Sequence, residues 1–419
     1  MDVLLISANT ERLNMVTLPL GLGLVAAATR RAGHRVEFLD LLSAADPTAA
    51  IREAIERVRP DVIGISIRNI DDQSSAAPRF LLAQARPVVD ACRSCTGAPV
   101  VLGGAGYSIF PRAALEFLGA DFGIRGDGEA AFPALLERLG RGEDPRGIPG
   151  LYVAGEDLDR GRAVAPDLDD LPLWDDALSG CADPADPTLW VPVQSTRGCP
   201  NDCSYCSTAS IQGRALRCRS PREVAATVSR LSASGWRRFY FVDNSFNLPE
   251  SHAYEMCAAL EPLGVEWRCI LYPHGVTEGL VDALARAGCI EVSLGFESGC
   301  VTVLRQMNKR FTPDEILQVS GWLKARGIRR FGFLLLGGPG ETRESVEESL
   351  AFARQVAPDL LRITVGLRIY PGTALARQAV AEGVLDPADD LLQPRFYLAP
   401  GLDPWIRQRV AEAFPDAMR

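Results

Sequence analysis

The sequence predicts an α/β fold in two successive regions. Short apolar runs alternate with amphipathic helical patterns from residue 2 to about residue 140, and the alternation resumes at residue 191. A stretch rich in Pro, Gly and Asp separates the two regions. Apolar residues make up 47% of the 419 residues, which is ample for two sizeable cores. Because strands that alternate with helices form parallel sheets, we expect two α/β domains joined by a linker.

The first region, residues 1–140, is predicted to form a doubly wound, Rossmann-like sheet. Its apolar runs predict strands at residues 3–7, 36–40, 62–67, 100–103 and 122–125. The intervening patterns predict helices at residues 20–32, 47–58, 75–92, 111–118 and 129–140. Ligands bind such sheets at the carboxyl ends of the strands, near the point where the strand order reverses.

The linker, residues 141–190, contains no long periodic segment, and only a hairpin around residues 151–153 is expected there. In the second region, residues 191–380, strands are predicted at 191–196, 238–243, 266–272, 290–296, 331–336 and 361–369. Helices are predicted between them at 222–234, 251–262, 277–287, 313–326 and 343–355. Six βα units are fewer than the eight of a closed barrel. We expect the short tail, residues 381–419, to cap this barrel and to help shape a substrate pocket.

Composition and charge argue against several classes of protein. The net charge is −9 and no basic stripe is present, so nucleic acid is not expected as a partner. No apolar run is long enough to span a bilayer, and the first residues do not resemble a signal peptide. Eleven cysteines in a large chain without an export signal favour reduced thiols over a disulfide framework. We therefore expect a cytoplasmic protein.

Three cysteines mark the start of the second region. Cys199, Cys203 and Cys206 follow one another at the spacing C-x3-C-x2-C, directly after the first predicted strand. Thiolates are soft ligands that suit iron–sulfur clusters, and three of them on one loop can hold three corners of a cubane. The alternative is a structural zinc site, which needs a fourth ligand. No histidine lies nearby and Cys218 is twelve residues further on, so the spacing favours the cluster.

This loop, with Tyr205 before its last cysteine, resembles the signature of the radical S-adenosylmethionine (SAM) superfamily. The resemblance implies a 4Fe–4S cluster whose open iron chelates SAM. One electron from an external flavodoxin- or ferredoxin-type donor would then cleave SAM to a 5′-deoxyadenosyl radical. It also implies that the six βα units form the open, partial (β/α)6 barrel of that superfamily.

The resemblance further implies a set of SAM-binding residues at the ends of the predicted strands. Tyr205 is expected to pack on the adenine, and Asp243 and Asn244 to accept from the amino group. Their alternative role is an Asx turn or a helix cap. Glu297 and Arg305, with the nearby Lys309, are expected at the ribose and the carboxylate; the alternative for the two cations is a solvated helix surface. The full set is Tyr205, Asp243, Asn244, Glu297, Ser298, Arg305, Gly337, Gly338 and Tyr370.

The N-terminal region resembles the cobalamin-binding domain that precedes the barrel in some radical SAM enzymes. The similar segments are residues 17–23, which begin at Thr17, residues 32–36 with the strand-terminal Asp40, and residues 64–71, 101–104 and 125–129. Their small and polar residues cluster at predicted strand ends, where they let a flat macrocycle approach the backbone and bond its amide arms. The implied cobalamin-binding residues are Pro19, Gly21, Ser66, Arg68, Asn69, Asp71, Gln73, Gly103, Gly104, Gly126 and Glu129.

Three further patterns in this region have alternative explanations. The chain lacks the Asp-x-His-x-x-Gly motif that supplies a lower ligand to cobalamin, so residues 68–73 are expected at the corrin instead. The alternative is that Asp71 or Asp72 caps the next helix. Residues 21–26 fit G-x-G-x-x-A, but residues 8–20 separate them from the first strand, which argues against dinucleotide binding. The pair Cys92 and Cys95 is interpreted as two incidental thiols.

The resemblance as a whole implies methyl transfer to an unactivated carbon, or to phosphorus, of a small molecule or natural-product intermediate. A radical formed on the substrate would take the methyl group from methylcobalamin. The alternative is radical cyclisation, ring rearrangement or oxidation, with cobalamin in another role or absent. A third possibility is a non-catalytic cobalamin or SAM sensor. His274 and Tyr397 are candidates for contact with the substrate.

Overall fold

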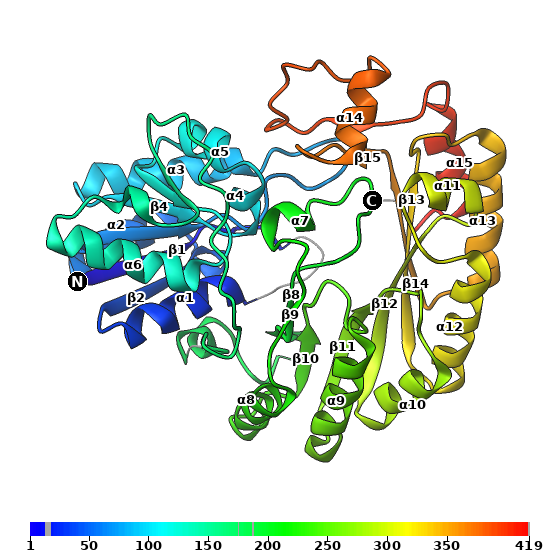
Figure 1. Ribbon diagram of the computed structural model, residues 1–419, viewed down its shortest axis with the longest axis horizontal. Coiled ribbons are helices and arrows are strands. Elements are labelled where there is room, and N and C mark those ends of the chain that lie inside the picture. The colour runs from blue at the N-terminus through cyan, green and yellow to red at the C-terminus, as the bar shows by residue number, and fades with distance from the viewer. Residues whose placement is uncertain (13–17, 175, 187, 418–419) are drawn as a thin grey trace. The chain divides into compact units, whose positions relative to one another are not determined.

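The computed structural model describes residues 1–12, 18–174, 176–186 and 188–417. The chain divides into two units that exchange short segments. Unit 1 contains Met1–Asp72, Arg79–Trp190 and Ser210–Gly213. Unit 2 contains Gln73–Pro78, Val191–Ala209 and the described residues from Arg214 onward. Each unit is built around its own sheet (Figure 1).

The sheet of unit 1 has six strands in the order β2-β1-β3-β4-β5-β6. All neighbours are parallel except β5 and β6. The reversal of strand order between β1 and β3 creates the predicted ligand-binding edge. A hairpin was expected around residues 151–153, but β6 pairs with β5 and extends the sheet instead. The strands are β1 (Asp2–Ser7), β2 (Arg35–Asp40), β3 (Val62–Ser66), β4 (Val100–Gly103), β5 (Phe122–Ile124) and β6 (Leu151–Val153).

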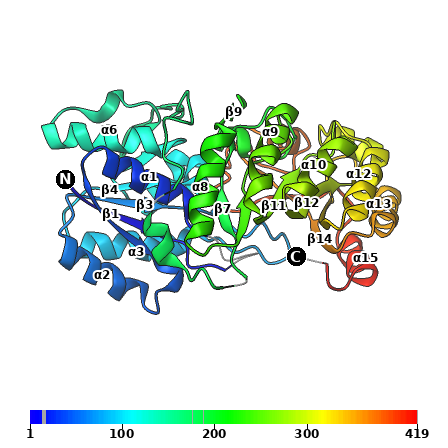
Figure 2. The same ribbon diagram turned by 90° about the horizontal axis from the view of Figure 1, so that it is seen from below.

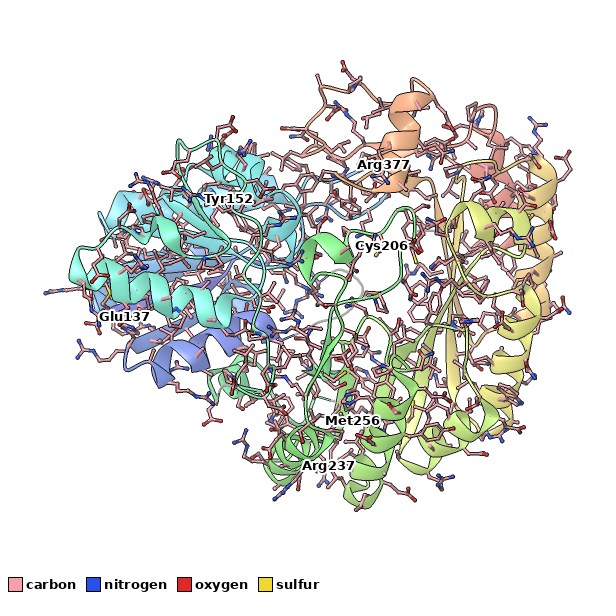
Figure 3. The ribbon with its side chains drawn as sticks, viewed as in Figure 1. Glu137, Tyr152, Cys206, Arg237, Met256 and Arg377 are labelled. Atoms are coloured by element: carbon pink, nitrogen blue, oxygen red, sulfur yellow. The ribbon has the colours of Figure 1, made fainter. Side chains whose placement is uncertain are left out.

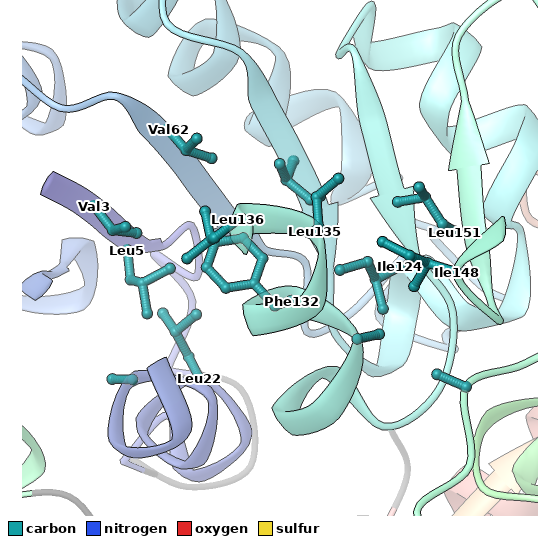
Figure 4. Packing of buried hydrophobic residues seen from close by; sticks show 14 residues of the cluster. Val3, Leu5, Leu22, Val62, Ile124, Phe132, Leu135, Leu136, Ile148 and Leu151 are labelled. Carbon is teal, nitrogen blue, oxygen red and sulfur yellow. The ribbon is translucent and has the colours of Figure 1, made fainter. Parts of the chain in front are cut away.

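Helices cover both faces of this sheet, as a doubly wound fold requires. Helices α1 (Leu20–Arg31) and α6 (Gly128–Arg141) lie on one face, and α2 (Pro47–Val58) and α3 (Leu82–Cys95) lie on the other (Figure 2). Two shorter helices, α4 (Ala105–Ile109) and α5 (Pro111–Leu118), follow β4. Phe132, Leu135 and Leu136 of α6 pack with Val3 and Leu5 of β1 in the core (Figure 4).

Helix α3 begins at Leu82, later than the predicted start at residue 75. The intervening residues Gln73–Pro78 belong to unit 2, where the hydroxyl of Ser75 donates to the carbonyl of Val365. Neither Asp71 nor Asp72 caps the helix, because its N-cap residue is Leu81. The Asp72 carboxylate instead accepts from the amide of Arg79 at 3.1 Å. The capping alternative for these two residues is therefore wrong.

The sheet of unit 2 confirms the open barrel, because six parallel strands follow one another in chain order without closing. The order is β14-β13-β12-β11-β10-β7. The strands are β7 (Val191–Val193), β10 (Arg238–Phe241), β11 (Glu266–Leu271), β12 (Cys289–Glu297), β13 (Arg329–Leu336) and β14 (Leu360–Val365). Their outer face is covered by α8 (Pro221–Ala233), α9 (Glu250–Leu260), α10 (Glu278–Arg286), α12 (Pro313–Ala325) and α13 (Arg343–Val356) (Figure 1).

The tail after the barrel divides between two places. After α14 (Ala374–Ala381), strand β16 (Phe396–Tyr397) pairs with β15 (Leu367–Arg368) beyond the carboxyl end of β14. Helix α15 (Trp405–Ala413) packs against α13 on the outside of the unit, where Arg409 bonds Glu347. Only the first part therefore lies at the strand ends, where a cap was expected. None of the helices in the described ranges is long and apolar enough to cross a membrane.

Candidate functional site

The three cysteines lie on the loop that joins strand β8 (Thr196–Arg197) to helix α7 (Thr208–Ile211). After α7 the chain returns as β9 (Arg217–Cys218), which pairs antiparallel with β8. Gly198 opens the loop at a φ of +94°, and a Cβ atom there would lie 2.0 Å from the carbonyl oxygen of Ala215. Only glycine fits this backbone, so the residue before Cys199 fixes the direction of the loop. Figure 3 labels Cys206 at the end of the loop.

Asp243, which follows β10, holds the start of this loop in place through hydrogen bonds. Its buried carboxylate accepts from the amide of Ser195 at 2.8 Å, the Ser195 hydroxyl at 2.6 Å and the amide of Thr196 at 2.7 Å. Burial raises the pKa of Asp243 to about 6, although the hydrogen bonds from Ser195 and Thr196 act in the opposite direction and lower it. The neighbouring Asn244 donates to the carbonyl of Gly198 at 3.0 Å. Both predicted SAM contacts thus hold the loop in place; their contact with SAM stays a prediction.

Residues after helix α11 (Val301–Gln306) hold the loop from the other side. The amide of Ser204 donates to the carbonyl of Met307 at 3.1 Å, and the Asn308 side chain donates to the carbonyl of Asp202 at 3.2 Å. Asn308 has a φ of +56°, so the chain turns sharply immediately before Lys309. These bonds place the cysteine loop beside the turn that follows α11.

Glu297, Tyr205 and Lys309 form a hydrogen-bonded triad at this point. The Tyr205 hydroxyl donates to Oε1 of Glu297 at 3.0 Å, and the Lys309 ammonium donates to the same oxygen at 3.1 Å. Within the described chain Oε2 of Glu297 accepts no hydrogen bond, so one oxygen remains for a ligand. Glu297 has a φ of +55° beside a register shift in β12, a strained backbone of the kind that functional sites retain.

Three aromatic rings surround the Lys309 ammonium. It lies 5.3 Å from the ring centre of Tyr205, 5.8 Å from Tyr272 and 5.7 Å from Phe311. Rings at this distance attract a cation through their electron-rich faces. Burial by itself lowers the Lys309 pKa, but the neighbouring Glu297 carboxylate outweighs it, and the net pKa lies well above the usual value. The pairing with Glu297 thus favours the ammonium form of Lys309 at this buried position.

The donor set fits an iron–sulfur cluster. Burial raises the pKa of the Cys199 and Cys203 thiols, whereas the nearby Lys309 lowers both. All three cysteines are free. Among the described residues, no three His, Cys, Asp or Glu side chains converge as the ligands of a single metal ion do. Thiolates that bind three separate irons of a cubane need not converge on one point, so three cysteines on one loop suit such a cluster.

The remaining predicted SAM residues lie in different surroundings. Ser298 is buried and bonds the Ser349 hydroxyl at 2.8 Å. Arg305 is exposed on α11, whereas Lys309 is buried beside the cysteines. Tyr370 accepts from the Gln73 side chain at 3.1 Å. The structure thus brings Tyr205, Glu297 and Lys309 together and leaves Arg305 outside this group.

Gly337 and Gly338, after β13, donate both of their amides to Oε2 of Glu341, the latter at 3.0 Å. Burial raises the Glu341 pKa to about 7, and Oε1 of this carboxyl has no hydrogen-bond partner within the described chain. Glu341 was not among the predicted site residues, because its motif drew attention to the glycines. The signal was present, since a carboxylate four residues after a strand-end glycine can bond back to the turn.

The two candidate substrate contacts differ in exposure. His274 lies on the surface and bonds Glu315 at 2.9 Å. Tyr397 is buried in β16, and its hydroxyl donates to Glu382 at 2.5 Å. Neither environment tests their contact with a substrate.

In unit 1, a small polar hollow lies at the switch point between β1 and β3. Its walls include Ser66, Arg68 and Asn69, which were predicted to bind cobalamin, and its volume is about 20 Å³. Gly21 is exposed near the start of α1, and Gly103 ends β4, with no atom within 3.8 Å of where a Cβ would be added. Amide and hydroxyl groups at these strand ends match the polar arms of a corrin. Thr17 lies outside the described residues.

Two predicted cobalamin glycines are also required by the chain's own backbone. A Cβ on Gly104 would lie 2.5 Å from the carbonyl oxygen of Ile67, and one on Gly126 would lie 2.3 Å from that of Ala163. Asp71 and Glu129 are buried, and Pro19 precedes α1. Gln73 belongs to unit 2, where its side chain donates to the Tyr370 hydroxyl. Gly21 and Gly23 both lie inside α1 and not in a turn after β1, so the dinucleotide motif is absent in three dimensions.

Two family profiles match this chain. The profile described as the radical SAM superfamily matches residues 193–353, and the profile described as the B12 binding domain matches residues 6–136. The first covers the strands and loop of unit 2, and the second covers the doubly wound sheet of unit 1.

Related proteins match over most of their length. An uncharacterized methyltransferase of Pyrococcus horikoshii is 28% identical over 88% of this chain and 79% of its own. The cytidylyl-2-hydroxyethylphosphonate methyltransferase of Streptomyces wedmorensis is 24% identical over 94% of this chain and 84% of its own. Among solved structures, the radical SAM methyltransferase TsrM of Kitasatospora setae, with cobalamin and a 4Fe–4S cluster bound, superposes with a TM-score of 0.85. It is 22% identical and covers 99% of this chain and 88% of its own, a likeness of fold.

Proposed function

This chain belongs to the radical SAM superfamily and carries a B12-binding domain ahead of its radical SAM domain, and we propose that it is a cobalamin-dependent methyltransferase. The observation that carries the proposal is that one chain contains both modules, each with residues suited to its cofactor. Relatives that match most of the chain are named methyltransferases, which supports the same reaction here. The substrate is a small molecule, methylated at an unactivated carbon or at phosphorus.

Different residues serve the cluster, cobalamin and SAM. Cys199, Cys203 and Cys206 hold the cluster, and Ser66, Arg68 and Asn69 bind polar arms of cobalamin. When bound, the cluster supplies the electron that cleaves SAM and cobalamin carries the methyl group that is transferred. The open oxygen Oε2 of Glu297 accepts from a hydroxyl or amino group of SAM, while Tyr205 and Lys309 fix the other oxygen. Asp243 and Asn244 keep the loop rigid, which preserves the geometry that a radical reaction needs.

The electron comes from an external protein of the flavodoxin or ferredoxin type, and the reaction takes place in the cytoplasm. Both parts of this proposal rest on the need of such a cluster for a low-potential donor. The negative net charge of −9 supports a partner other than nucleic acid.

The test uses protein purified without oxygen, with its cluster reconstituted and cobalamin added. We expect about one cobalamin per chain by absorbance spectroscopy, a measurement that needs no substrate. SAM labelled in its methyl group is then supplied with an electron donor and small molecules of the classes that relatives act on, a phosphonate nucleotide and tryptophan. We expect the label in the product of one class.

Two results would contradict the proposal. A chain that binds no cobalamin under these conditions cannot use it as a methyl carrier. Release of 5′-deoxyadenosine with an unlabelled product would favour the alternative, a radical rearrangement or oxidation. The Cys95→Ala variant is a control, since this thiol lies in unit 1, remote from the cysteine loop in the chain.

A further inference from the structure

Lysine is rare in this protein, and one of its few lysines is buried. Of the 44 lysines and arginines in the sequence, only Lys309 and Lys324 are lysines. Lys324 is exposed on α12, as expected for a cationic side chain. The side chain of Lys309 is only 6% exposed. A chain that uses arginine almost everywhere therefore keeps a compact ammonium at this one buried position.

The surroundings of Lys309 hold its charge in place. Its ion-pair partner Glu297 has a side chain that is 13% exposed, and the two charges are 3.1 Å apart. Three rings enclose the ammonium, and the hydroxyl of one of them, Tyr272, also accepts from the amide of the next residue, Arg310, at 2.9 Å. Removing an ammonium or a carboxylate from water is costly unless the two are paired, so the pair persists as a unit.

The same pair is tied to the cysteine loop. Tyr205, which bonds Glu297, stands between Cys203 and Cys206 in the sequence. Ser204 bonds Met307, two residues before Lys309. Asn308, the residue before Lys309, donates its side-chain amide to the carbonyl of Asp202, the residue before Cys203, at 3.2 Å. The charge pair is therefore buried beside the loop that carries the cysteines, and buried charges act through a medium of low polarity, where their effect is large.

We propose that Lys309 and Glu297 form a buried charge pair that sets the reduction potential of the cluster held by Cys199, Cys203 and Cys206. This inference rests on the proposed function only in requiring the cluster. Reduction adds one electron and hence one negative charge to the cluster. The Lys309 ammonium stabilises that added charge and raises the potential, whereas the Glu297 carboxylate lowers it. The charge pair thus balances two requirements. The cluster must accept an electron readily, and the reduced cluster must be a strong enough reductant to cleave SAM.

The test is a redox titration of the cluster, followed by electron paramagnetic resonance without SAM or substrate. Lys309→Met leaves the Glu297 charge unbalanced, so we expect a more negative midpoint potential than in wild type. Glu297→Gln leaves the ammonium unbalanced, so we expect a less negative potential. The double variant removes both charges and returns the potential toward the wild-type value. Lys309→Arg keeps the charge and shifts the potential less than Lys309→Met.

Lys324→Met is the matched control, because it removes the other lysine from an exposed helix and leaves the potential unchanged. Unchanged potentials in both single variants would overturn the proposal, as would shifts of the same sign. If a single variant loses its cluster, the potential of the double variant is compared with that of the remaining single variant, because the double variant buries no unpaired charge. Methyl transfer plays no part in the measurement, so a potential shift without methyl transfer refutes only the proposed function. A wild-type chain that assembles no cluster contradicts both.

Labelling provides an independent check on the burial of Lys309. An amine-reactive reagent applied to the folded protein is expected to modify Lys324 readily and Lys309 only after unfolding. Peptide mass spectrometry distinguishes the two sites. Equal labelling of both lysines in the folded protein would remove the buried charge on which the proposal depends.

Discussion

In unit 2, polar side chains at the strand ends bond to the cysteine loop, whereas in unit 1 several strand-end residues accommodate the chain's own backbone. Asp243, Asn244 and the triad with Glu297 illustrate the first case. Gly104 and Gly126, each facing a carbonyl oxygen of another segment, illustrate the second. Similar motifs thus serve two purposes. In unit 2 they hold the cysteine loop in place, and in unit 1 they let segments pass close together just after strands β4 and β5.

The largest expected effect concerns the cysteine loop of unit 2. In Cys203→Ala the cluster loses one of three protein ligands, and we expect SAM cleavage to fall below detection. Iron and sulfide content and the visible absorbance of the reconstituted protein report the cluster directly. The Cys95→Ala variant removes a thiol of unit 1 and should retain wild-type cleavage. Normal SAM cleavage by the Cys203 variant would refute the assignment of the cluster.

A pair of glycine variants separates the two units. Gly198→Ala and Gly126→Ala each place a Cβ within 2.3 Å of a carbonyl oxygen at a positive φ. Each strained backbone costs on the order of 1–3 kcal/mol before the clash is counted. We expect Gly198→Ala to lower the iron content with cobalamin binding retained. Gly126→Ala should weaken cobalamin binding with iron content retained, and identical losses in both variants would erase the distinction between the units.

A smaller effect is expected from the pH dependence of Glu341. Burial raises its pKa from 4.5 to about 7, so the folded state binds this proton more tightly than the unfolded state. Its contribution to stability is therefore complete below pH 4.5 and is lost as the pH rises toward 7, by up to about 3 kcal/mol. Glu341→Gln keeps an acceptor for the amides of Gly337 and Gly338 but cannot titrate. The variant should lose less stability than wild type between pH 5 and pH 8.

Denaturant midpoints of the cofactor-free protein at the two pH values measure this difference. Glu344→Gln, on the exposed first turn of α13, is the matched control and should follow the wild-type pH dependence. Parallel pH dependence in wild type and Glu341→Gln would show that this carboxyl titrates normally.

Much of the fold could be predicted because hydrophobic periodicity is a local signal. The start and end of α2 and α5 match their predictions, and the six strands of unit 2 lie within the predicted ranges or a few residues of them. The misplaced start of α3 had a non-local cause, because residues 73–78 bond to a strand nearly three hundred residues later. Strand β6 was missed as a sheet member for the same reason, since pairing partners are not visible in a single short segment.

The candidate site was predictable in its chemistry and less so in its connections. The spacing of Cys199, Cys203 and Cys206 predicts the cluster ligands from local sequence, and the structure places all three on one loop. Which of two nearby cations reaches the loop could not be read in the same way, because it depends on the left-handed turn at Asn308. Arg305 was grouped with the site, yet the turn directs Lys309 inward. The bracing role of Asp243 likewise depends on two amides 47 and 48 residues earlier in the chain.

The exchange of Gln73–Pro78 into unit 2 has a consequence for synthesis on the ribosome. Domains usually fold from the N-terminus as the chain emerges. Here the side chains of Gln73 and Ser75 bond to Tyr370 and Val365, which are translated 297 and 290 residues later. The nascent chain must therefore carry this segment without its partners until almost the entire protein has been made. The segment Gln73–Pro78 can therefore take its final place only when the last barrel strand, β14, has been made.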